Sequence, residues 1–274
     1  MNAQEQQFHA SVMEYYQQYG RHSLPWRVAR GTESINPYCV VVSEYMLQQT
    51  QVARVLTKYP LFLSRFPTVN ALAAAPQSAV VRVWQGLGYN RRAIALHRSA
   101  LRIVQEYGGR IPRAYEDLIS LPGIGHATAG AIQAFAFNKP VVFIETNIRR
   151  AFIDFFFTSS ENVADKDIMP LVEKTQGNVS SREWYYALMD YGAFLSKQKN
   201  NPNRKSAHYS LQSPFEGSNR QLRAATIRML LDRPRSRDDI VETLSVAEDR
   251  METILFSLQK DGFIRQDATM IFLV

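Results

Sequence analysis

Two stretches of the chain combine residue types and spacings suited to chemistry on a nucleotide. Residues 121–130 read Leu-Pro-Gly-Ile-Gly-His-Ala-Thr-Ala-Gly, and Glu145 follows in the run Phe-Ile-Glu-Thr-Asn-Ile-Arg-Arg. The first stretch predicts a helix, a tight hairpin and a second helix. Gly123 and Gly125 would let the backbone approach a phosphate, which the N–H groups of the second helix could bind. Glu145 lies just beyond this hairpin, and a carboxylate held against a nucleotide sugar points to chemistry at a glycosidic bond.

A second carboxylate, Glu44, follows an apolar turn in Val-Ser-Glu-Tyr-Met-Leu-Gln-Gln-Thr-Gln. Burial disfavours the charged form, so the pKa of Glu44 should rise and the group could donate a proton near neutral pH. Gln48, Gln49 and Thr50 offer uncharged groups for base edges or for the space that a displaced base leaves. Taken alone, a glutamate after an apolar run also suits a helix surface.

An aromatic and basic stretch lies at residues 84–92, Trp-Gln-Gly-Leu-Gly-Tyr-Asn-Arg-Arg. Tyr89 could stack on a base or wedge beside it, while Arg91 or Arg92 meets a phosphate. The same pattern is compatible with Trp84 as a plain core residue.

Composition limits the class of protein. Apolar residues make up 46% and charged residues 21% of 274, with a net charge of +7, as in an ordinary globular protein. The single cysteine, Cys39, lies in an apolar run and suits a core position. It allows neither a disulfide framework nor a thiolate cluster. The five histidines show no metal-ligand spacing. No apolar run reaches the ~20 residues of a membrane span, and we expect a cytoplasmic, nucleoid-associated protein.

The positive charge is concentrated in residues 197–237, which hold ten cationic and two acidic residues. Such a block favours an anionic polymer as partner, although a solvated basic face is the simpler alternative.

Residues 36–194 predict one helix after another, and residues 195–219 predict a polar loop. A helix from about Arg220 to Leu231 should follow, and Ser236 and Ser245 each resemble the start of a capping box. Two strand-like pieces after Gly262 complete a pattern similar to a winged helix. The third helix would carry a net charge of −2, which disfavours entry into a DNA groove. It therefore favours a packing or partner-docking role, and any DNA contact of this unit should come from its first helix and the preceding basic loop.

Together these stretches resemble the helix-hairpin-helix (HhH-GPD) DNA glycosylases, and most closely their adenine-specific (MutY-type) branch. The resemblance covers roughly residues 8–195. It rests on Pro-Trp-Arg at 25–27, Pro-Tyr at 37–38, residues 43–51, Gly-Leu-Gly-Tyr at 86–89, Leu-Pro-Gly-Ile-Gly at 121–125 and Ala-Leu-Met-Asp at 187–190.

The resemblance implies a role for each matching residue. Glu44 would protonate the base and manage the water, Glu145 would stabilise the sugar cation, and Asn147 would be a neighbouring active-site residue. Glycosidases solve the same problem with two carboxylates. The target base would be flipped from the duplex, with Gln48, Gln49 or Tyr89 filling the gap. The expected DNA contacts are Gln48, Gln49, Thr50, Tyr89, Arg91, Arg92, Gly123, Gly125, His126, Thr128, Arg149, Lys197, Lys199, Arg204 and Lys205.

The chain departs from the family pattern in four places. Glu145 replaces an aspartate, and its extra methylene would move the charge by ~1.5 Å unless the backbone compensates. Ala127 stands where lyase-proficient relatives carry a lysine, so no Schiff base can form. Non-thiol residues take the places of the four cysteines of a [4Fe–4S] cluster, and we expect a clusterless member. We expect the winged-helix-like unit in place of the C-terminal domain by which typical members sense oxidised guanine. The residues at the cysteine places are Ser196, Asn203, Ser206 and about Gln212.

We therefore expect a mainly α, two-lobed helix-hairpin-helix glycosylase fold with a small C-terminal winged-helix-like unit. Its domains would be residues 1–195, a basic loop at 196–218 in place of the cluster loop, and residues 219–274. The expected function is a monomeric, monofunctional DNA glycosylase without AP-lyase activity, acting in base excision repair. Its substrate would be double-stranded DNA with a mismatch or lesion, most simply adenine opposite 8-oxoguanine or guanine.

No catalytic metal is expected, although carbonyls of the 121–125 hairpin could hold a monovalent cation. Three alternatives remain open: the same chemistry on another damaged or deaminated base, a DNA-lesion binding protein without catalysis, and a winged-helix regulator.

Overall fold

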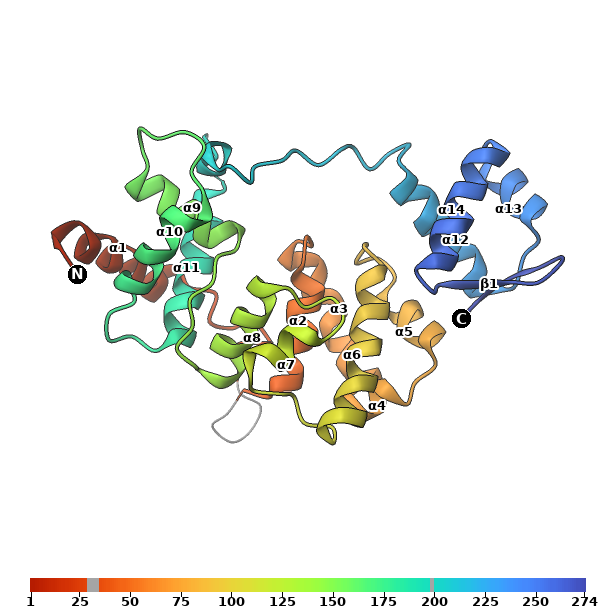
Figure 1. Ribbon diagram of the computed structural model, residues 1–274, viewed down its shortest axis with the longest axis horizontal. Coiled ribbons are helices and arrows are strands. Elements are labelled where there is room, and N and C mark those ends of the chain that lie inside the picture. The colour runs from red at the N-terminus through yellow and green to blue at the C-terminus, as the bar shows by residue number, and fades with distance from the viewer. Residues whose placement is uncertain (29–34, 198–199) are drawn as a thin grey trace. The chain divides into compact units, whose positions relative to one another are not determined.

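The computed structural model describes residues 1–28, 35–197 and 200–274 (Figure 1). Across these ranges the chain consists of helices and their connections, with one two-stranded antiparallel sheet near the C-terminus. The helical character expected for residues 36–194 is confirmed. None of the helices in the described ranges is long and apolar enough to cross a lipid bilayer.

The chain forms two compact units, each built from several segments. Unit 1 comprises Met1–Glu44, Arg113–Ser120 and Ile124–Leu211, and unit 2 comprises Tyr45–Pro112, Leu121–Gly123 and Gln212–Val274. Helix α2 (Pro37–Leu47) passes from one unit into the other between Glu44 and Tyr45. The C-terminal residues thus belong to the same unit as residues 45–112, whereas the domain division expected at residues 195 and 218 stays a prediction.

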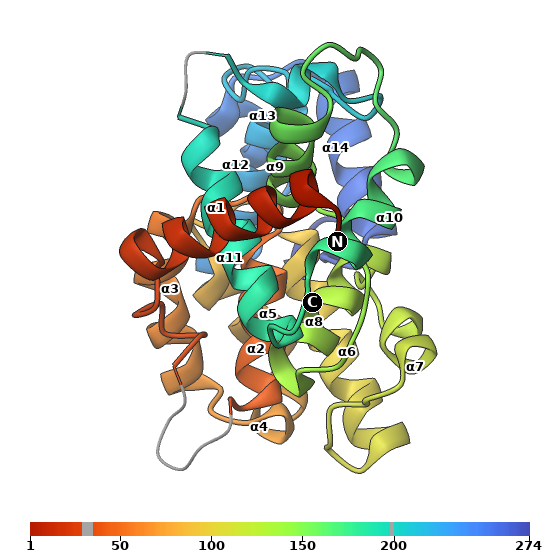
Figure 2. The same ribbon diagram turned by 90° about the vertical axis from the view of Figure 1, so that its left-hand side faces the viewer.

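Unit 1 is organised around a long buried helix, α11. Its helices are α1 (Ala3–Tyr19), α7 (Tyr115–Ser120), α8 (His126–Phe137), α9 (Thr146–Phe156), α10 (Asp165–Thr175), α11 (Ser181–Leu195) and the 3₁₀ helix η1 (Pro202–Lys205). Helix α11 packs against α1, α8 and α9, and α1 runs across it (Figure 2). Aromatic rings fill the core, where the ring centroids of Phe8 and Phe152 lie 4.7 Å apart and the ring of Phe8 packs edge-on to that of Trp184.

Glycine allows α9 and α11 to touch. A Cβ atom at Gly192 would lie 2.1 Å from the carbonyl oxygen of Asn147, a distance that no side chain can adopt. The start of α9, which carries Glu145 and Asn147, therefore rests directly on the backbone of α11.

In unit 2, α6 (Arg91–Tyr107) packs against α4 (Val69–Ala73) and α5 (Gln77–Trp84), and α3 (Val52–Arg65) packs against α5. Buried residues recur on one face of α6 at Ala93, Leu96, Ala100 and Ile103, as helical periodicity requires. The helix ends at Gly108, whose left-handed backbone (φ +59°) closes it. Trp84 is fully buried beside the ring of Phe62.

The C-terminal segment, Gln212–Val274, contains α12 (Asn219–Asp232), α13 (Arg237–Leu244), α14 (Glu248–Lys260), β1 (Ile264–Gln266) and β2 (Ile271–Leu273). The strands pair antiparallel, with Ile264 opposite Leu273. Three helices followed by a hairpin is the order expected from the sequence, and the winged-helix likeness itself stays a prediction. Ser236 caps α13 by accepting the N–H of Asp239, also as expected.

The prediction for Ser245 was wrong. Ser245 ends α13 with a left-handed backbone (φ +48°), and Ala247 precedes the first residue of α14. The motif Ser-x-x-Glu is present, but Ser245 forms the C-cap of α13 and therefore cannot also be the N-cap of α14.

Gly192→Ala is expected to lower the free energy of unfolding by ~1–3 kcal/mol, because its Cβ forces α9 and α11 apart. Urea unfolding measures this. Gly125→Ala is a matched control, since a Cβ there meets no atom within 4 Å and φ is −96°. Equal stability of the two variants would contradict the close approach.

Candidate active site

Glu44 is the only ionisable carboxylate on an otherwise apolar helix, α2. Its side chain keeps some accessible surface, yet the surrounding protein strongly desolvates the carboxyl. Burial, and then the negative charge of Glu145, raise the pKa of Glu44 to about 8, against the opposing charge of Arg27. The carboxyl is therefore protonated at neutral pH, which is the state that a proton donor needs. The interaction also shows that Glu44 and Glu145 lie within electrostatic reach of each other in unit 1.

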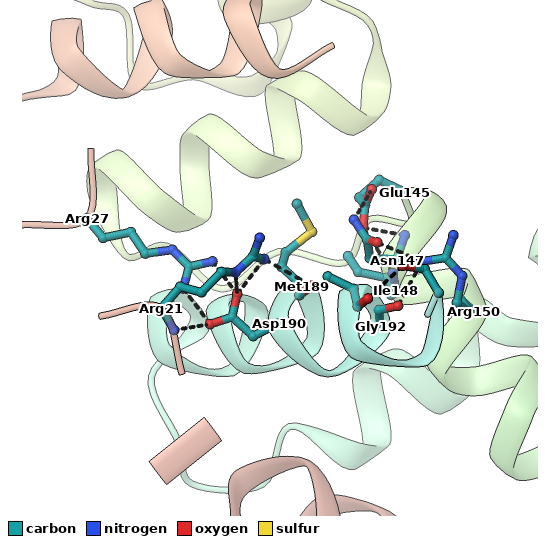
Figure 3. Close-up of polar contacts among 11 residues, drawn as sticks. Arg21, Arg27, Glu145, Asn147, Ile148, Arg150, Met189, Asp190 and Gly192 are labelled. Atoms are coloured by element: carbon teal, nitrogen blue, oxygen red, sulfur yellow. Dashed lines mark hydrogen bonds and ion pairs between the residues drawn. The ribbon is translucent and has the colours of Figure 1, made fainter. Parts of the chain in front are cut away.

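Glu145 occupies the N-cap of α9. One carboxylate oxygen, Oε1, accepts hydrogen bonds from the backbone N–H groups of Asn147 (2.6 Å) and Ile148 (3.0 Å). The other, Oε2, accepts one from the side-chain amide of Asn147 at 3.3 Å (Figure 3). Burial raises the pKa of Glu145, while the two N–H groups and the nearby Arg150 and Arg149 act in the opposite direction. Glutamate thus makes the N-cap contacts that shorter acidic side chains usually make.

Asn147 is held on its other side by Arg150. The Asn147 Oδ1 atom accepts a hydrogen bond from Arg150 Nη1 at 2.8 Å, and the same nitrogen donates to the carbonyl of Gly192 at 2.7 Å. Arg150 Nε donates to Asn201 Oδ1 at 3.1 Å. The amide of Asn147 is therefore fixed between Glu145 and the buried Arg150, so its orientation does not depend on solvent.

Sequence reasoning missed a buried ion cluster on α11. Asp190, 2% exposed, accepts hydrogen bonds from Arg27 Nη1 (2.8 Å) and Nη2 (2.9 Å) and from Arg21 Nε (2.6 Å), as Figure 3 shows. Burial alone would raise the pKa of Asp190, but the two arginines lower it below its ordinary value. The guanidinium of Arg27 also lies 4.2 Å above the ring of Tyr186.

This cluster ends close to the candidate acid, because both Arg27 and Tyr186 interact electrostatically with Glu44. Two polar atoms there, Arg27 Nε and the Tyr186 hydroxyl, are buried and have no hydrogen-bond partner among the described residues. The motifs that contain Arg27 and Asp190 supported the family resemblance, but nothing in their spacing indicated that they pair.

The hairpin adopts the conformation that its glycines predict. Gly123 has a left-handed backbone (φ +80°), and a Cβ there would lie 2.8 Å from the Cβ of Ala95. Gly125 is exposed and forms the N-cap of α8 without a side-chain cap. The carbonyl of Pro122 accepts hydrogen bonds from Tyr45 and Ser99. Since two side chains already use this carbonyl, a cation at the hairpin would rely on its other carbonyls, and cation binding stays a prediction.

The loop at the cluster position is held by hydrogen bonds. Asn203 is buried and its amide donates to the carbonyl of Thr146 at 3.0 Å. The backbone N–H of Val163 donates to the Lys205 carbonyl, and the Val163 carbonyl accepts the N–H of Ala207. The buried Ser206 accepts the N–H of His208. A [4Fe–4S] cluster needs four thiolates, so serine and asparagine donors do not fit one. Within the described ranges, no group of three or more histidine, cysteine or acidic side chains could hold a metal ion.

The structure corrects one of the two candidates for phosphate binding. Arg92 is buried, and its Nη1 atom donates to the carbonyls of Tyr45, Met46 and Gln48 at the end of α2. Its Nη2 atom donates to Thr50 and to the 86–89 turn. Arg92 therefore closes a helix end and holds the turn in place. Arg91 is 67% exposed at the surface, where its Nε atom pairs with Asp261 at 2.5 Å.

The other expected DNA contacts fall into two groups. The first group lies in unit 2 and consists of Gln48, Gln49, Thr50, Tyr89 and Gly123. Within it, the Gln48 amide donates to the Gly123 carbonyl. Arg149 pairs with Asp165 through two hydrogen bonds of 2.6 and 2.7 Å, which offsets its charge. Lys205 donates to the Thr158 carbonyl, and Lys199 lies outside the described residues. Gly125, His126, Lys197 and Arg204 are exposed and Thr128 is partly exposed in unit 1. Their contacts with DNA stay predictions.

Comparison with known proteins supports the family resemblance. Residues 42–174 match the family described as "HhH-GPD superfamily base excision DNA repair protein". An adenine DNA glycosylase of Buchnera aphidicola subsp. Baizongia pistaciae is 36% identical over 197 residues, covering 70% of this chain and 54% of that protein. That of Mycolicibacterium smegmatis is 30% identical over 270 residues, covering 91% and 90%. The chain thus spans about half the length of the first relative and most of the second.

Solved structures agree on the fold. A thermostable thymine-DNA glycosylase matches with a TM-score of 0.62 at 23% identity, over 74% of this chain and 93% of that one. The protein of a non-covalent endonuclease III–DNA complex matches with a TM-score of 0.55 at 19% identity, over 82% and 98%. These neighbours confirm the mainly helical helix-hairpin-helix glycosylase fold.

Glu44→Gln should stabilise the protein at high pH. The folded-state pKa of Glu44 is about 8, against an ordinary value of 4.5, so its contribution to stability is complete below pH 4.5 and is lost as the pH rises through 8. Glutamine mimics the protonated carboxyl. Above pH 8, the unfolding free energy of the variant should exceed that of the wild type by up to ~1.4 kcal/mol for each unit by which folding raises the pKa of Glu44. Below pH 4.5 the two proteins should not differ for this reason. Denaturant unfolding across pH measures this.

The exposed Glu173→Gln on α10 is the control and should show no such trend. A difference between Glu44→Gln and wild type that is the same at every pH would contradict a desolvated, protonated Glu44.

Asp190→Asn is expected to lower the free energy of unfolding by ~3–5 kcal/mol, because it leaves the buried Arg27 without a counter-charge. Thermal unfolding detects the loss as a lower Tm. Glu106→Gln breaks an exposed ion pair with Arg102 and should leave Tm unchanged. Similar Tm values for the two variants would show that the buried cluster is not a stabilising centre.

Proposed function

Because this chain belongs to the HhH-GPD superfamily of base excision DNA repair proteins, and within it to the adenine DNA glycosylase family, we propose that it hydrolyses the N-glycosidic bond of a mispaired base. The observation that carries this proposal is a pair of neighbouring buried carboxyls, one on an apolar helix and the other at a helix N-terminus. Burial and the charge of Glu145 keep Glu44 protonated. Burial also raises the pKa of Glu145, but backbone N–H groups and two arginines oppose this and favour its charged form.

This pair could supply the proton donor and the negative charge that hydrolysis of a glycosidic bond needs. Glu44 would give its proton to a ring nitrogen of the leaving base, so that the base departs neutral as the bond to the sugar breaks. The Glu145 carboxylate would stabilise the positive charge that forms on the sugar. The Glu44 carboxylate would then take a proton from the attacking water, whose oxygen bonds to the sugar carbon. The products are the free base and an abasic site, and Glu44 is protonated again.

The proposed substrate is double-stranded DNA in which adenine lies opposite 8-oxoguanine or guanine, bound by a monomeric enzyme. The names of the relatives support adenine as the base. Ala127, the second residue of α8, cannot form a Schiff base, and this supports a monofunctional enzyme that leaves the DNA strand intact. A cytoplasmic, nucleoid-associated location stays part of the proposal.

Single-turnover base release from labelled duplexes tests the proposal. Adenine opposite 8-oxoguanine or guanine should be released, with strand breakage only after added alkali. Glu44→Gln should reduce the rate by ~10²-fold or more, and Glu145→Gln by a similar factor. Glu145→Asp keeps the charge at the N-cap and should retain more activity than Glu145→Gln.

Three other results would redirect the interpretation. Release of another base from a panel of uracil, thymine, hypoxanthine and alkylated purines would keep the mechanism and change the substrate. Tight duplex binding without any release would make the protein a lesion-binding factor. Sequence-specific duplex binding lost on mutation of the C-terminal segment alone would favour a regulator.

A further inference from the structure

Four arginines of unit 2 lie around Asp261 and Tyr89. Arg91 Nε and Arg223 Nη2 each lie 2.5 Å from Asp261 Oδ2, at the end of α14. Arg98 donates to the Asp261 carbonyl at 3.5 Å. Arg220, one turn before Arg223 on α12, donates to the hydroxyl of Tyr89 at 3.2 Å. We call Arg91, Arg98, Arg220 and Arg223 the arginine cluster.

The arginine cluster carries more positive charge than the protein neutralises there. Among the described residues, the ion pairs formed by its members all end on Asp261. Burial lowers the pKa of Arg223, and the charge of Arg91 lowers it further, while Asp261 raises it. Like charges held this close repel each other, and a single carboxylate cannot balance four guanidinium groups. An added anion would therefore be bound favourably.

The position of the cluster favours a DNA phosphate as that anion. Arg220 donates to the Tyr89 hydroxyl, and Arg91 lies two residues beyond Tyr89 in the sequence, so two members of the cluster are next to the residue expected to wedge beside a base. Tyr89 itself has a left-handed backbone (φ +46°) between Gly88 and α6, which turns it out of the helix. Guanidinium groups match phosphate oxygens with paired hydrogen bonds. The acidic residues of α14, Glu248, Asp249 and Glu252, lie in its first two turns, toward the opposite end from Asp261.

We infer that the C-terminal segment is a duplex-binding element, in which the arginine cluster holds a backbone phosphate beside Tyr89 and this phosphate replaces the Asp261 carboxylate. The inference rests on the proposed function, since it requires that the chain binds duplex DNA. It assigns the DNA contact of this segment to the start of α12, and it gives Asp261 the role of an internal anion that fills the site until DNA arrives. The acidic face of α14 takes no part.

The test is equilibrium binding of the full chain to a fluorescent duplex containing adenine opposite 8-oxoguanine, repeated over a range of salt concentrations. Arg220→Gln and Arg223→Gln should each weaken binding severalfold. Each should also reduce the slope of log Kd against log salt by about one unit, as expected for one lost phosphate contact. Asp261→Asn should tighten binding, because the competing carboxylate is gone. Arg223→Lys should retain the slope of the wild type.

Arg233→Gln is the matched control. It removes the same charge from the same segment, but at the far end of α12, about 20 Å from Arg220 along the helix. Its salt slope should equal that of the wild type. Arg223→Gln removes the ion pair with Asp261 and could unfold the segment. Arg220 is partly exposed and forms no part of that pair, so Arg220→Gln tests the inference independently.

Each other result has a definite meaning. Wild-type affinity and slope in both glutamine variants would overturn the inference while leaving the proposed function intact. Tighter binding by Arg220→Gln or Arg223→Gln would also overturn it, and would indicate that the segment shields the Tyr89 turn from DNA. A wild-type chain that neither binds the duplex nor releases adenine would instead refute the proposed function.

Discussion

The candidate site depends on the direct contact between α9 and α11 at Gly192. Because no side chain fits between Gly192 and the Asn147 carbonyl, the first turn of α9 is held at a fixed height above α11. Arg150 secures the contact by donating to both Asn147 and the Gly192 carbonyl. Glu145, as the N-cap of α9, inherits this position. The site is therefore set by backbone packing, and the carboxylate needs no long-range partner to be oriented.

Two neighbouring carboxyls acquire different chemistry from this arrangement. Glu145 lies at a helix N-terminus, where N–H groups favour negative charge. Glu44 lies on an apolar helix and is desolvated, with Arg27 as its opposing charge. Two coupled carboxyls share their protons as a pair, and burial raises the pKa of both, to about 8 for Glu44. The Asp190 cluster holds Arg27 in place, and the charge of Arg27 limits the rise in the pKa of Glu44.

Hydrogen bonds hold the loop after α11 in place. Asn201 contacts Arg150, Asn203 contacts Thr146, and Ser206 turns the backbone beside Val163. These contacts join the loop to the start of α9, so the segment that carries the basic residues is tied to the catalytic helix. The small polar residues Asn201, Asn203 and Ser206 thus have a local structural task in this loop.

The sequence alone determined the features that depend on short-range spacing: the succession of helices, the glycine hairpin, and the three helices and hairpin of the C-terminus. Tertiary structure decided which charges are used internally. Arg92 closes α2 while Arg91 stays exposed, Arg149 pairs with Asp165, and Asp190 binds arginines more than 160 positions away. Periodicity reports the face of a helix on which a residue lies, but not the element that packs there. Since desolvation and ion pairing depend on that packing, the protonation of Glu44 and the arginine cluster around Asp261 could not be read from the sequence.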